Sequence, residues 1–352
     1  MNHNIMKTTN YNGHNVLYFN ALQPIALECG KTLHAVQIAY HTYGTLNAAK
    51  DNVVWICHAL TANSDAADWW QGMIGNGLLF DTSKYFIVCA NVIGSCYGST
   101  GPLSVNPATQ KPYYRDFPEV TVRDMIAAHE LLREFLGIDK IKILVGGSIG
   151  AFQVLEWSIM HPEIFEMLIF SAAGARTSPW AIALNEAQRM AIEADATFFD
   201  DVPNGGAKGL AAARAIALTS YRNYAIYNES QEDPDHSKLR DYRVCSYQRY
   251  QGEKLVRRFD AYTYYRLTQS IDSYDISRGR GGDTAQVLQR ITIPALIIGI
   301  STDALFPICE QKWIAAQMPN AEYKEVNSKF GHDGFLIENQ QLSQIIEKVI
   351  NK

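Results

Sequence analysis

A serine flanked by glycines is the first feature of this sequence that could do chemistry. The run Gly146-Gly147-Ser148-Ile149-Gly150 matches the pattern G-x-S-x-G and lies between a predicted strand and a predicted helix. Small residues two places either side permit a turn so tight that the Ser148 hydroxyl is lifted above the edge of a sheet. The backbone N–H of Ile149, at the start of the helix, can then face a developing oxyanion. The alternative interpretation is a glycine-rich turn around a buried serine.

Two later residues supply an acid and a base in the order that such a serine needs. Asp303 closely follows the apolar run 293–300, and His332 follows the strand-like run 322–326. The order Ser…Asp…His, with each residue placed after a strand, is typical of α/β-hydrolase catalytic triads. Asp303 alone would fit a helix N-cap equally well. Of the nine histidines only His332 has the required place in the order, so the sequence predicts a triad of these residues with Ser148.

A second oxyanion donor is expected from a loop that follows an earlier strand. His58-Ala59-Leu60-Thr61 comes directly after the apolar run Val53–Cys57. The backbone N–H of Leu60 is the candidate, to act together with that of Ile149. We interpret the side chain of His58 as a histidine packed at the end of a strand.

These residues require an alternation of strands and helices to position them. Strand-like apolar runs occur at 53–57, 85–90, 141–145, 167–171, 293–300 and 322–326; helical patterns occur at 122–136, 151–160, 207–220, 309–317 and 337–351. The alternation predicts a mostly parallel sheet with helices on both faces. Residues 176–290 contain helical patterns and no convincing buried strand, with a flexible return at 277–282. We therefore predict an α/β-hydrolase core formed by 1–175 and 291–352, interrupted by a helical lid insertion.

Composition excludes several classes of protein. The 352 residues carry a net charge of −5 without a basic stripe, which argues against nucleic-acid binding. No apolar run is long enough to span a membrane, and the N-terminus lacks the apolar region of a signal peptide. The six scattered cysteines have no metal-ligand spacing and the histidines do not cluster, so we expect no metal. Together these features predict a cytoplasmic protein with reduced thiols.

Beyond the serine turn, the sequence resembles the homoserine O-acyltransferases of methionine biosynthesis from about residue 19 to the C-terminus. General hydrolases share the serine turn but not the other matching segments, so the resemblance is specific. The matching segments are CHALT (57–61), NVIGSCYGSTGP (91–102), DFP (116–118), VGGS (145–148), NEAQR (185–189), YQGEK (250–254), RFDA (258–261), DALFP (303–307) and GHDGFL (331–336).

The resemblance implies a two-step reaction and an acceptor site. Ser148, deprotonated by His332, would take the acyl group of an acyl-coenzyme A, and homoserine would then accept it through its hydroxyl. The positions that match the family's substrate-binding residues are Arg222, for the carboxylate, and Asp333, for the amine. No cofactor is implied beyond acetyl-coenzyme A as a co-substrate. A homodimer is implied as well, with the tyrosine-rich insertion as lid, dimer surface or both.

The sequence leaves the substrates and one rival activity open. Ala62, Ala151 and Phe152 depart from residues common in the family and lie near the expected acyl pocket. The donor is acetyl- or succinyl-coenzyme A, and the acceptor homoserine or serine; the lack of an arginine placed for a succinyl carboxylate favours acetyl. A serine esterase or thioesterase would use the same triad with water as acceptor. A non-catalytic binding protein is disfavoured because all three triad residues are in place.

Overall fold

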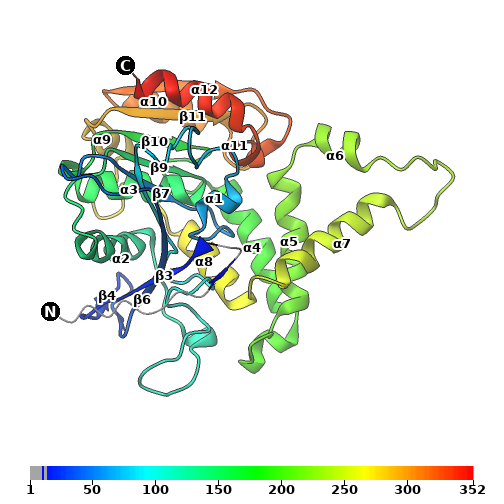
Figure 1. Cartoon of the computed structure of the whole chain (residues 1–352). Helices are drawn as coiled ribbons and strands as arrows, with labels where there is room; N and C mark the ends of the chain where they lie inside the picture. Colours follow the sequence, from blue (N-terminus) through cyan, green and yellow to red (C-terminus); the bar gives the residue numbers. More distant parts are fainter. Residues whose placement is uncertain (1–9, 12–13, 352) are drawn as a thin grey trace.

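The computed structural model describes residues 10–11 and 14–351 and has one large β-sheet at its centre (Figure 1). The strands of this sheet are β3 (Leu17–Asn20), β6 (Gln37–Tyr43), β7 (Val53–Cys57), β8 (Phe86–Ala90), β9 (Ile143–Gly147), β10 (Leu168–Ser171), β11 (Ala295–Ile300) and β12 (Ala321–Val326). Two small hairpins lie outside it, formed by β1 (Asn10–Tyr11) with β2 (His14–Asn15) and by β4 (Ile25–Ala26) with β5 (Thr32–Leu33).

The order of the strands is β12-β11-β10-β9-β7-β8-β6-β3. The strands from β12 to β8 run parallel to one another, whereas β6 and β3 extend one edge by antiparallel pairing. The predicted α/β class with a mostly parallel sheet is thereby confirmed. The parallel arrangement places the carboxyl ends of these strands on the same side of the sheet, where the loops that follow them meet.

Helices cover both faces of the sheet (Figure 1). The helices are α1 (Ala66–Trp69), α2 (Val122–Phe135), α3 (Ile149–Met160), α4 (Pro179–Glu193), α5 (Ala207–Tyr221), α6 (Tyr224–Gln231), α7 (Arg243–Val256), α8 (Ala261–Asp272), α9 (Thr284–Gln289), α10 (Ile308–Gln317), α11 (Gly334–Ile337) and α12 (Asn339–Ile350).

The central strands are apolar without interruption because both of their faces are buried. In β7, Trp55 belongs to the core shared with α2 and α3, where its ring meets that of Trp157 edge-on at 5.1 Å. Its neighbour Ile56 belongs to the opposite core, which includes Leu342 and Ile346 of α12. Successive side chains of a strand point to opposite faces, so each face needs its own apolar set.

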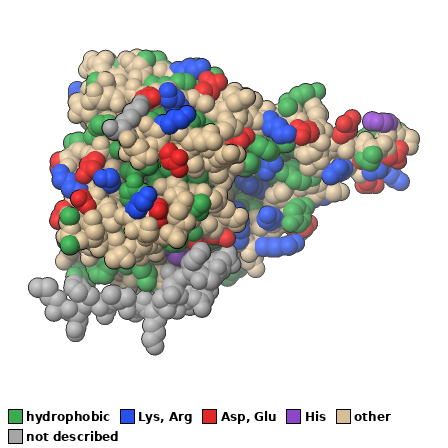
Figure 2. Space-filling view, turned by 45° about the horizontal axis from the view of Figure 1, so that its top comes forward, with side chains coloured by type: hydrophobic (Ala, Val, Ile, Leu, Met, Phe, Trp, Pro, Cys, Tyr) green, Lys and Arg blue, Asp and Glu red, His purple; other side chains and the backbone are tan. Residues whose placement is uncertain are grey.

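The segment between β10 and β11 forms the helices α4 to α9 and, within the described residues, adds no strand to the sheet. An isolated bridge between Arg176 and Asp275 joins the segment where the chain enters the insertion to the segment where it returns. The hairpin of α6 and α7 projects from the body as an arm (Figures 1 and 2). Large apolar side chains are exposed on the arm, with Tyr224 85% and Leu239 93% accessible.

Some details differ from the sequence-based expectations. The strands β3 and β6 were not predicted. The final helix, expected over 337–351, is α12 at Asn339–Ile350, and the short helix α11 that precedes it was not expected. The return at 277–282 was expected to be flexible because of its glycines. However, Arg278 pairs with Glu28 at 2.9 Å, and Arg280 pairs with the buried Glu156.

The described residues contain no helix that has both the length and the apolar character needed to cross a lipid bilayer.

Candidate active site

Ser148 occupies a strained turn between β9 and α3. Its φ of 57° and ψ of −127° are costly for a residue with a side chain. A Cβ atom at Gly146 would lie 2.5 Å from the backbone of Gly150, and a Cβ atom at Gly150 would lie 2.2 Å from the carbonyl oxygen of Cys57. Both positions therefore require glycine, and the close packing holds the serine in its unusual conformation.

The structure brings the three residues of the expected triad into one chain of hydrogen bonds. The Nε2 atom of His332 lies 2.9 Å from Oγ of Ser148, and its Nδ1 atom lies 2.7 Å from Oδ2 of Asp303. The other carboxylate oxygen of Asp303 accepts hydrogen bonds from the amides of Leu305 and Phe306, at 2.8 and 2.9 Å. The acid is thus fixed on both sides, and it fixes the imidazole in the orientation that a general base for Ser148 requires.

The charges around His332 favour its protonated form. Burial by itself lowers the pKa of this imidazole. The negative charge and the hydrogen bond of Asp303, with a contribution from Asp333, outweigh burial and raise the pKa of His332 above its usual value of 6.5. An imidazolium formed while the serine is being deprotonated is therefore stabilised where it arises.

The two backbone amides expected to bind the oxyanion lie at the same cavity as Ser148. This cavity is lined by both Leu60 and Ile149, and neither amide donates a hydrogen bond to another group in the part of the chain that the structure describes. His58 fixes the Leu60 loop: its Nε2 accepts the amide of Val92 at 3.1 Å, and its Nδ1 lies 2.9 Å from the carbonyl oxygen of Ala59. Burial lowers the pKa of His58 to about 4, so its ring is neutral at pH 7.

The cavity at Ser148 is small and mostly apolar, with a volume of about 20 Å³. It includes residues that the sequence analysis did not assign to the site. The ring of Tyr221, a tyrosine of the insertion, lies 5.7 Å from that of His332. Its position directly before Arg222 is the sequence signal that was available. Phe152, expected near the acyl pocket, lines the cavity too, and the unassigned lining residues are Ala181, Asn185, Tyr221, Ile271, Leu305 and Phe306.

Arg222 and Asp333 lie together next to the triad. The Nε atom of Arg222, at the end of α5, donates a hydrogen bond of 2.9 Å to Oδ2 of Asp333. Their side chains are 28% and 17% exposed, so the ion pair is partly shielded from water. The close approach of α5 depends on Gly331, where a Cβ atom would lie 2.7 Å from the carbonyl oxygen of Tyr221. The pair joins the insertion to the loop that carries the catalytic histidine.

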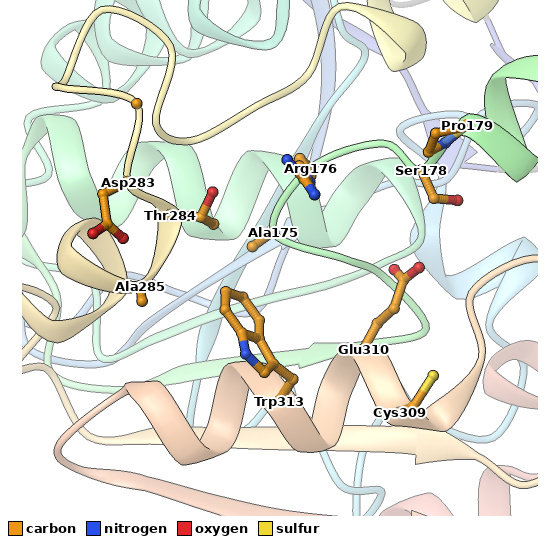
Figure 3. A pocket seen from close by; sticks show the side chains of 11 residues that line it. Ala175, Arg176, Ser178, Pro179, Asp283, Thr284, Ala285, Cys309, Glu310 and Trp313 are labelled. Carbon is orange, nitrogen blue, oxygen red and sulfur yellow. The ribbon is translucent and has the colours of Figure 1, made fainter.

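A larger cleft, of about 660 Å³, lies between the start of α4, the start of α9 and α10 (Figure 3). Ser148 does not line this cleft. One residue that does, Glu310, interacts electrostatically with Asp303 of the triad. Glu310 has a carboxylate oxygen, Oε2, that is buried without a hydrogen-bond partner among the described residues. Burial and then the charge of Asp303 raise the pKa of Glu310 to about 7, against the opposing effect of Arg176. Size alone would thus have selected a cleft that does not contain the nucleophile.

No group of three or more histidine, cysteine, aspartate or glutamate side chains is arranged to hold a metal ion in the described part of the chain. The six cysteines are free thiols. Burial raises the pKa of Cys57 and Cys89 well above the usual value, which makes both thiols unreactive.

Comparison with known proteins identifies the family to which this site belongs. Over 329 residues the chain is 46% identical to the homoserine O-acetyltransferase of Cyclobacterium marinum, a match that covers 94% of this chain and 93% of the relative. The chain belongs to the homoserine O-acetyltransferase family. The homoserine O-acetyltransferase of Chlorobaculum tepidum, another member, is 45% identical over 334 residues, covering 94% and 93% of the two chains. A family model described as the alpha/beta hydrolase fold matches residues 52–338.

Solved structures agree with this assignment of the fold. The homoserine O-acetyltransferase from Staphylococcus aureus, at 30% identity, superimposes with a TM-score of 0.79 over 96% of this chain and 95% of that one. The enzyme of the same name from Bacillus anthracis gives a TM-score of 0.89 at 23% identity, covering 96% and 97%. Esterase E22 gives 0.87 at 24% identity, covering 95% and 99%. The last two likenesses show the shared fold alone.

The charges around His332 predict how acylation of Ser148 depends on pH. The rate should rise with pH through the pKa of His332, because only the neutral imidazole can accept the serine proton. That midpoint should lie above 6.5. Asp303→Asn should lower the midpoint and reduce the rate by about 10³- to 10⁴-fold, and Asp333→Asn should lower the midpoint with a smaller loss. The measurement is the release of p-nitrophenolate from p-nitrophenyl acetate between pH 5 and 9.

Asp139→Asn is the matched control, because this exposed aspartate precedes β9 at the opposite end of the strands. Equal midpoints in the wild type, Asp303→Asn and Asp333→Asn would contradict the conclusion that these two charges raise the pKa of His332.

The raised pKa of Glu310 predicts a change in stability with pH. The folded state holds a proton on this carboxyl up to about pH 7, whereas the unfolded chain loses it near 4.5. Glu310 therefore destabilises the fold increasingly as pH rises from 4.5 to 7. Glu310→Gln should stabilise the protein at pH 8 by about 1 kcal/mol, a figure reduced because the side chain is partly exposed, and much less at pH 5. Urea unfolding at both pH values tests this, with the exposed Glu347→Gln as control; equal effects at both pH values would contradict it.

Proposed function

We propose that this protein transfers the acetyl group of acetyl-coenzyme A to the hydroxyl of L-homoserine by way of an acyl-Ser148 intermediate. The observation that carries the proposal is the ion pair of Arg222 and Asp333 beside the triad. A hydrolase, whose acceptor is water, needs no paired charges of this kind. An α-amino acid offers a carboxylate and an ammonium group, and each finds its opposite charge here. Membership of the homoserine O-acetyltransferase family supports the same acceptor.

In the first half of the reaction, His332 takes the proton of the Ser148 hydroxyl while its oxygen attacks the thioester carbonyl. The amides of Leu60 and Ile149 stabilise the resulting oxyanion. The carbon–sulfur bond then breaks, and the proton passes from His332 to the departing thiolate of coenzyme A. The acyl group remains on Ser148 as an ester, and the enzyme needs no bound cofactor for this step.

In the second half, the steps of acylation run in reverse, with the hydroxyl of homoserine in the place of the coenzyme A thiol. Its carboxylate binds to the guanidinium of Arg222 and its ammonium group to Asp333, so that one ion pair within the protein is replaced by two with the substrate. His332, adjacent in sequence to Asp333, takes the proton of the homoserine hydroxyl as the oxygen attacks the acyl ester. Collapse of the oxyanion releases O-acetylhomoserine and returns the proton from His332 to Ser148.

The rival is a serine esterase of the same fold, which would use the same triad with water as the acceptor. It differs from the proposal in the second half of the reaction alone. Succinyl-coenzyme A as donor and serine as acceptor are the alternatives within the transferase reading. A role in methionine biosynthesis and a homodimer stay predictions from the family resemblance, and a cytoplasmic location stays a prediction from the composition.

Release of coenzyme A from acetyl-coenzyme A, measured with and without L-homoserine, tests the proposal. We expect release that depends strongly on homoserine and falls by at least about a thousandfold in Ser148→Ala. Release that needs Ser148 but ignores homoserine would identify a hydrolase or a different acceptor. Serine in place of homoserine, and succinyl- in place of acetyl-coenzyme A, complete the comparison.

Variants of Arg222 should affect the second half of the reaction alone. Arg222→Ala removes a charge-assisted interaction of about 1.5–3 kcal/mol. We therefore expect kcat/KM for homoserine to fall by about 10- to 150-fold. Arg222→Lys, which keeps the charge but loses the planar fork, should be intermediate. Acylation by p-nitrophenyl acetate in the absence of homoserine should change little in both variants.

The control for these variants is Arg240→Ala, an exposed arginine in the loop of the arm. An equal loss in acylation and in transfer would mean that Arg222 supports the fold of the site instead of binding the acceptor.

A further inference from the structure

The cavity at Ser148 limits the size of the acyl group that the serine can carry. The space in it that the centre of a water-sized group can occupy is only about 20 Å³. An acyl group on Ser148 directs its carbonyl oxygen toward the amides of Leu60 and Ile149, which leaves the remaining carbons to the cavity. A methyl group fits that space, and each further carbon brings the acyl chain closer to the cavity wall.

Phe152 is the part of the cavity wall that comes from the same helix as the nucleophile. It lies one turn after Ser148 on α3 and has no exposed surface. Its ring stacks on that of Tyr274 with centroids 4.1 Å apart and planes 17° apart, and it meets the ring of Phe306 edge-on at 5.7 Å. Phe152 and Phe306 line the cavity, and Tyr274 packs against Phe152 without lining it.

This wall is anchored by groups that cannot move freely. The amide of Phe306 donates a hydrogen bond to Asp303, so a shift of Phe306 would disturb the catalytic acid. The carbonyl oxygen of Tyr274 accepts a hydrogen bond of 2.9 Å from the amide of Thr177. This bond ties Tyr274, near the end of the insertion, to the segment at its start. Because packed interiors accept added methylenes only with strain, a larger acyl group has little room to displace these rings.

The polarity of the cavity adds a second restriction. Among the described residues that line it, no side chain is charged; the polar ones are Ser148, Asn185 and Tyr221. The carboxylate of a succinyl group would lose its hydration here without gaining a cation. Size and polarity therefore act in the same direction.

We infer that Phe152, backed by Tyr274 and Phe306, is the residue that restricts the donor to short unbranched acyl groups, with acetyl preferred and both butyryl and succinyl excluded. The inference rests on the proposed function for the identity of the natural donor. The restriction itself concerns only acylation of Ser148 and can be measured without any amino-acid acceptor.

The experiment compares p-nitrophenyl acetate, propionate and butyrate as acylating agents, reading the release of p-nitrophenolate. For the wild type we expect a loss of about 10- to 200-fold for each added methylene. In Phe152→Ala the ratio of the butyrate to the acetate rate should rise by at least about tenfold, and in Phe152→Leu by less. The same variants, assayed with acetyl-, butyryl- and succinyl-coenzyme A, should gain butyryl transfer and, for lack of a cation, not succinyl transfer.

Phe165→Leu is the matched control, because Phe165 is a buried ring that packs on Trp157 and does not line the cavity. It should leave the ester ratio as in the wild type. Phe152→Leu keeps the test decisive if Phe152→Ala does not fold. A wild type that takes butyrate as fast as acetate, or Phe152 variants with the wild-type ratio, would overturn the inference. If the rate fell steeply from acetate to butyrate but release of coenzyme A did not depend on homoserine, the proposed acceptor would be refuted and the inference on acyl size would stand.

Discussion

The site depends above all on the conformation of Ser148. A residue with φ of 57° and ψ of −127° costs on the order of 1–3 kcal/mol relative to ordinary backbone, and the surrounding strands must supply that energy. They do so because β9 lies between β7 and β10 in the buried middle of the sheet, where both faces are packed. Gly146 and Gly150 remove the two clashes that would otherwise forbid the turn. With the serine fixed at the end of β9, the loops after β7, β11 and β12 bring Leu60, Asp303 and His332 to it.

Much of this arrangement could be predicted from the sequence because the signals are local. An uninterrupted apolar run indicates a strand buried on both faces, and the glycine pattern around Ser148 indicates a tight turn. Asp303 and His332 follow from their places after such strands. The edge strand β3 escaped prediction because all four of its residues are only partly buried, which weakens its pattern. The strand β6 lies between β8 and β3 and is mostly buried, but His41 and Thr42 interrupt its apolar run. Tyr221 was missed for a different reason, since its place at the cavity depends on how α5 packs against Gly331, which no local pattern records.

The pairing of Arg222 with Asp333 and the pKa of His332 are likewise tertiary properties. The sequence placed both charged residues near the site through resemblance, but not in contact with each other. Glu310 shows the converse, because its helix-start position suggests an ordinary exposed acid, whereas partial burial near Asp303 raises its pKa to about 7. Such effects depend on the separation of groups far apart in the chain, so they become visible only once the fold is known.

Residues of the insertion reach both parts of the site. Arg222, the charge proposed for the acceptor carboxylate, lies at the end of α5. The insertion also supplies four of the residues that line the cavity at Ser148, namely Ala181, Asn185, Tyr221 and Ile271. A single substitution in the insertion can therefore alter the selection of donor and acceptor together. The triad lies wholly outside the insertion, so its three residues can stay unchanged while the insertion diverges.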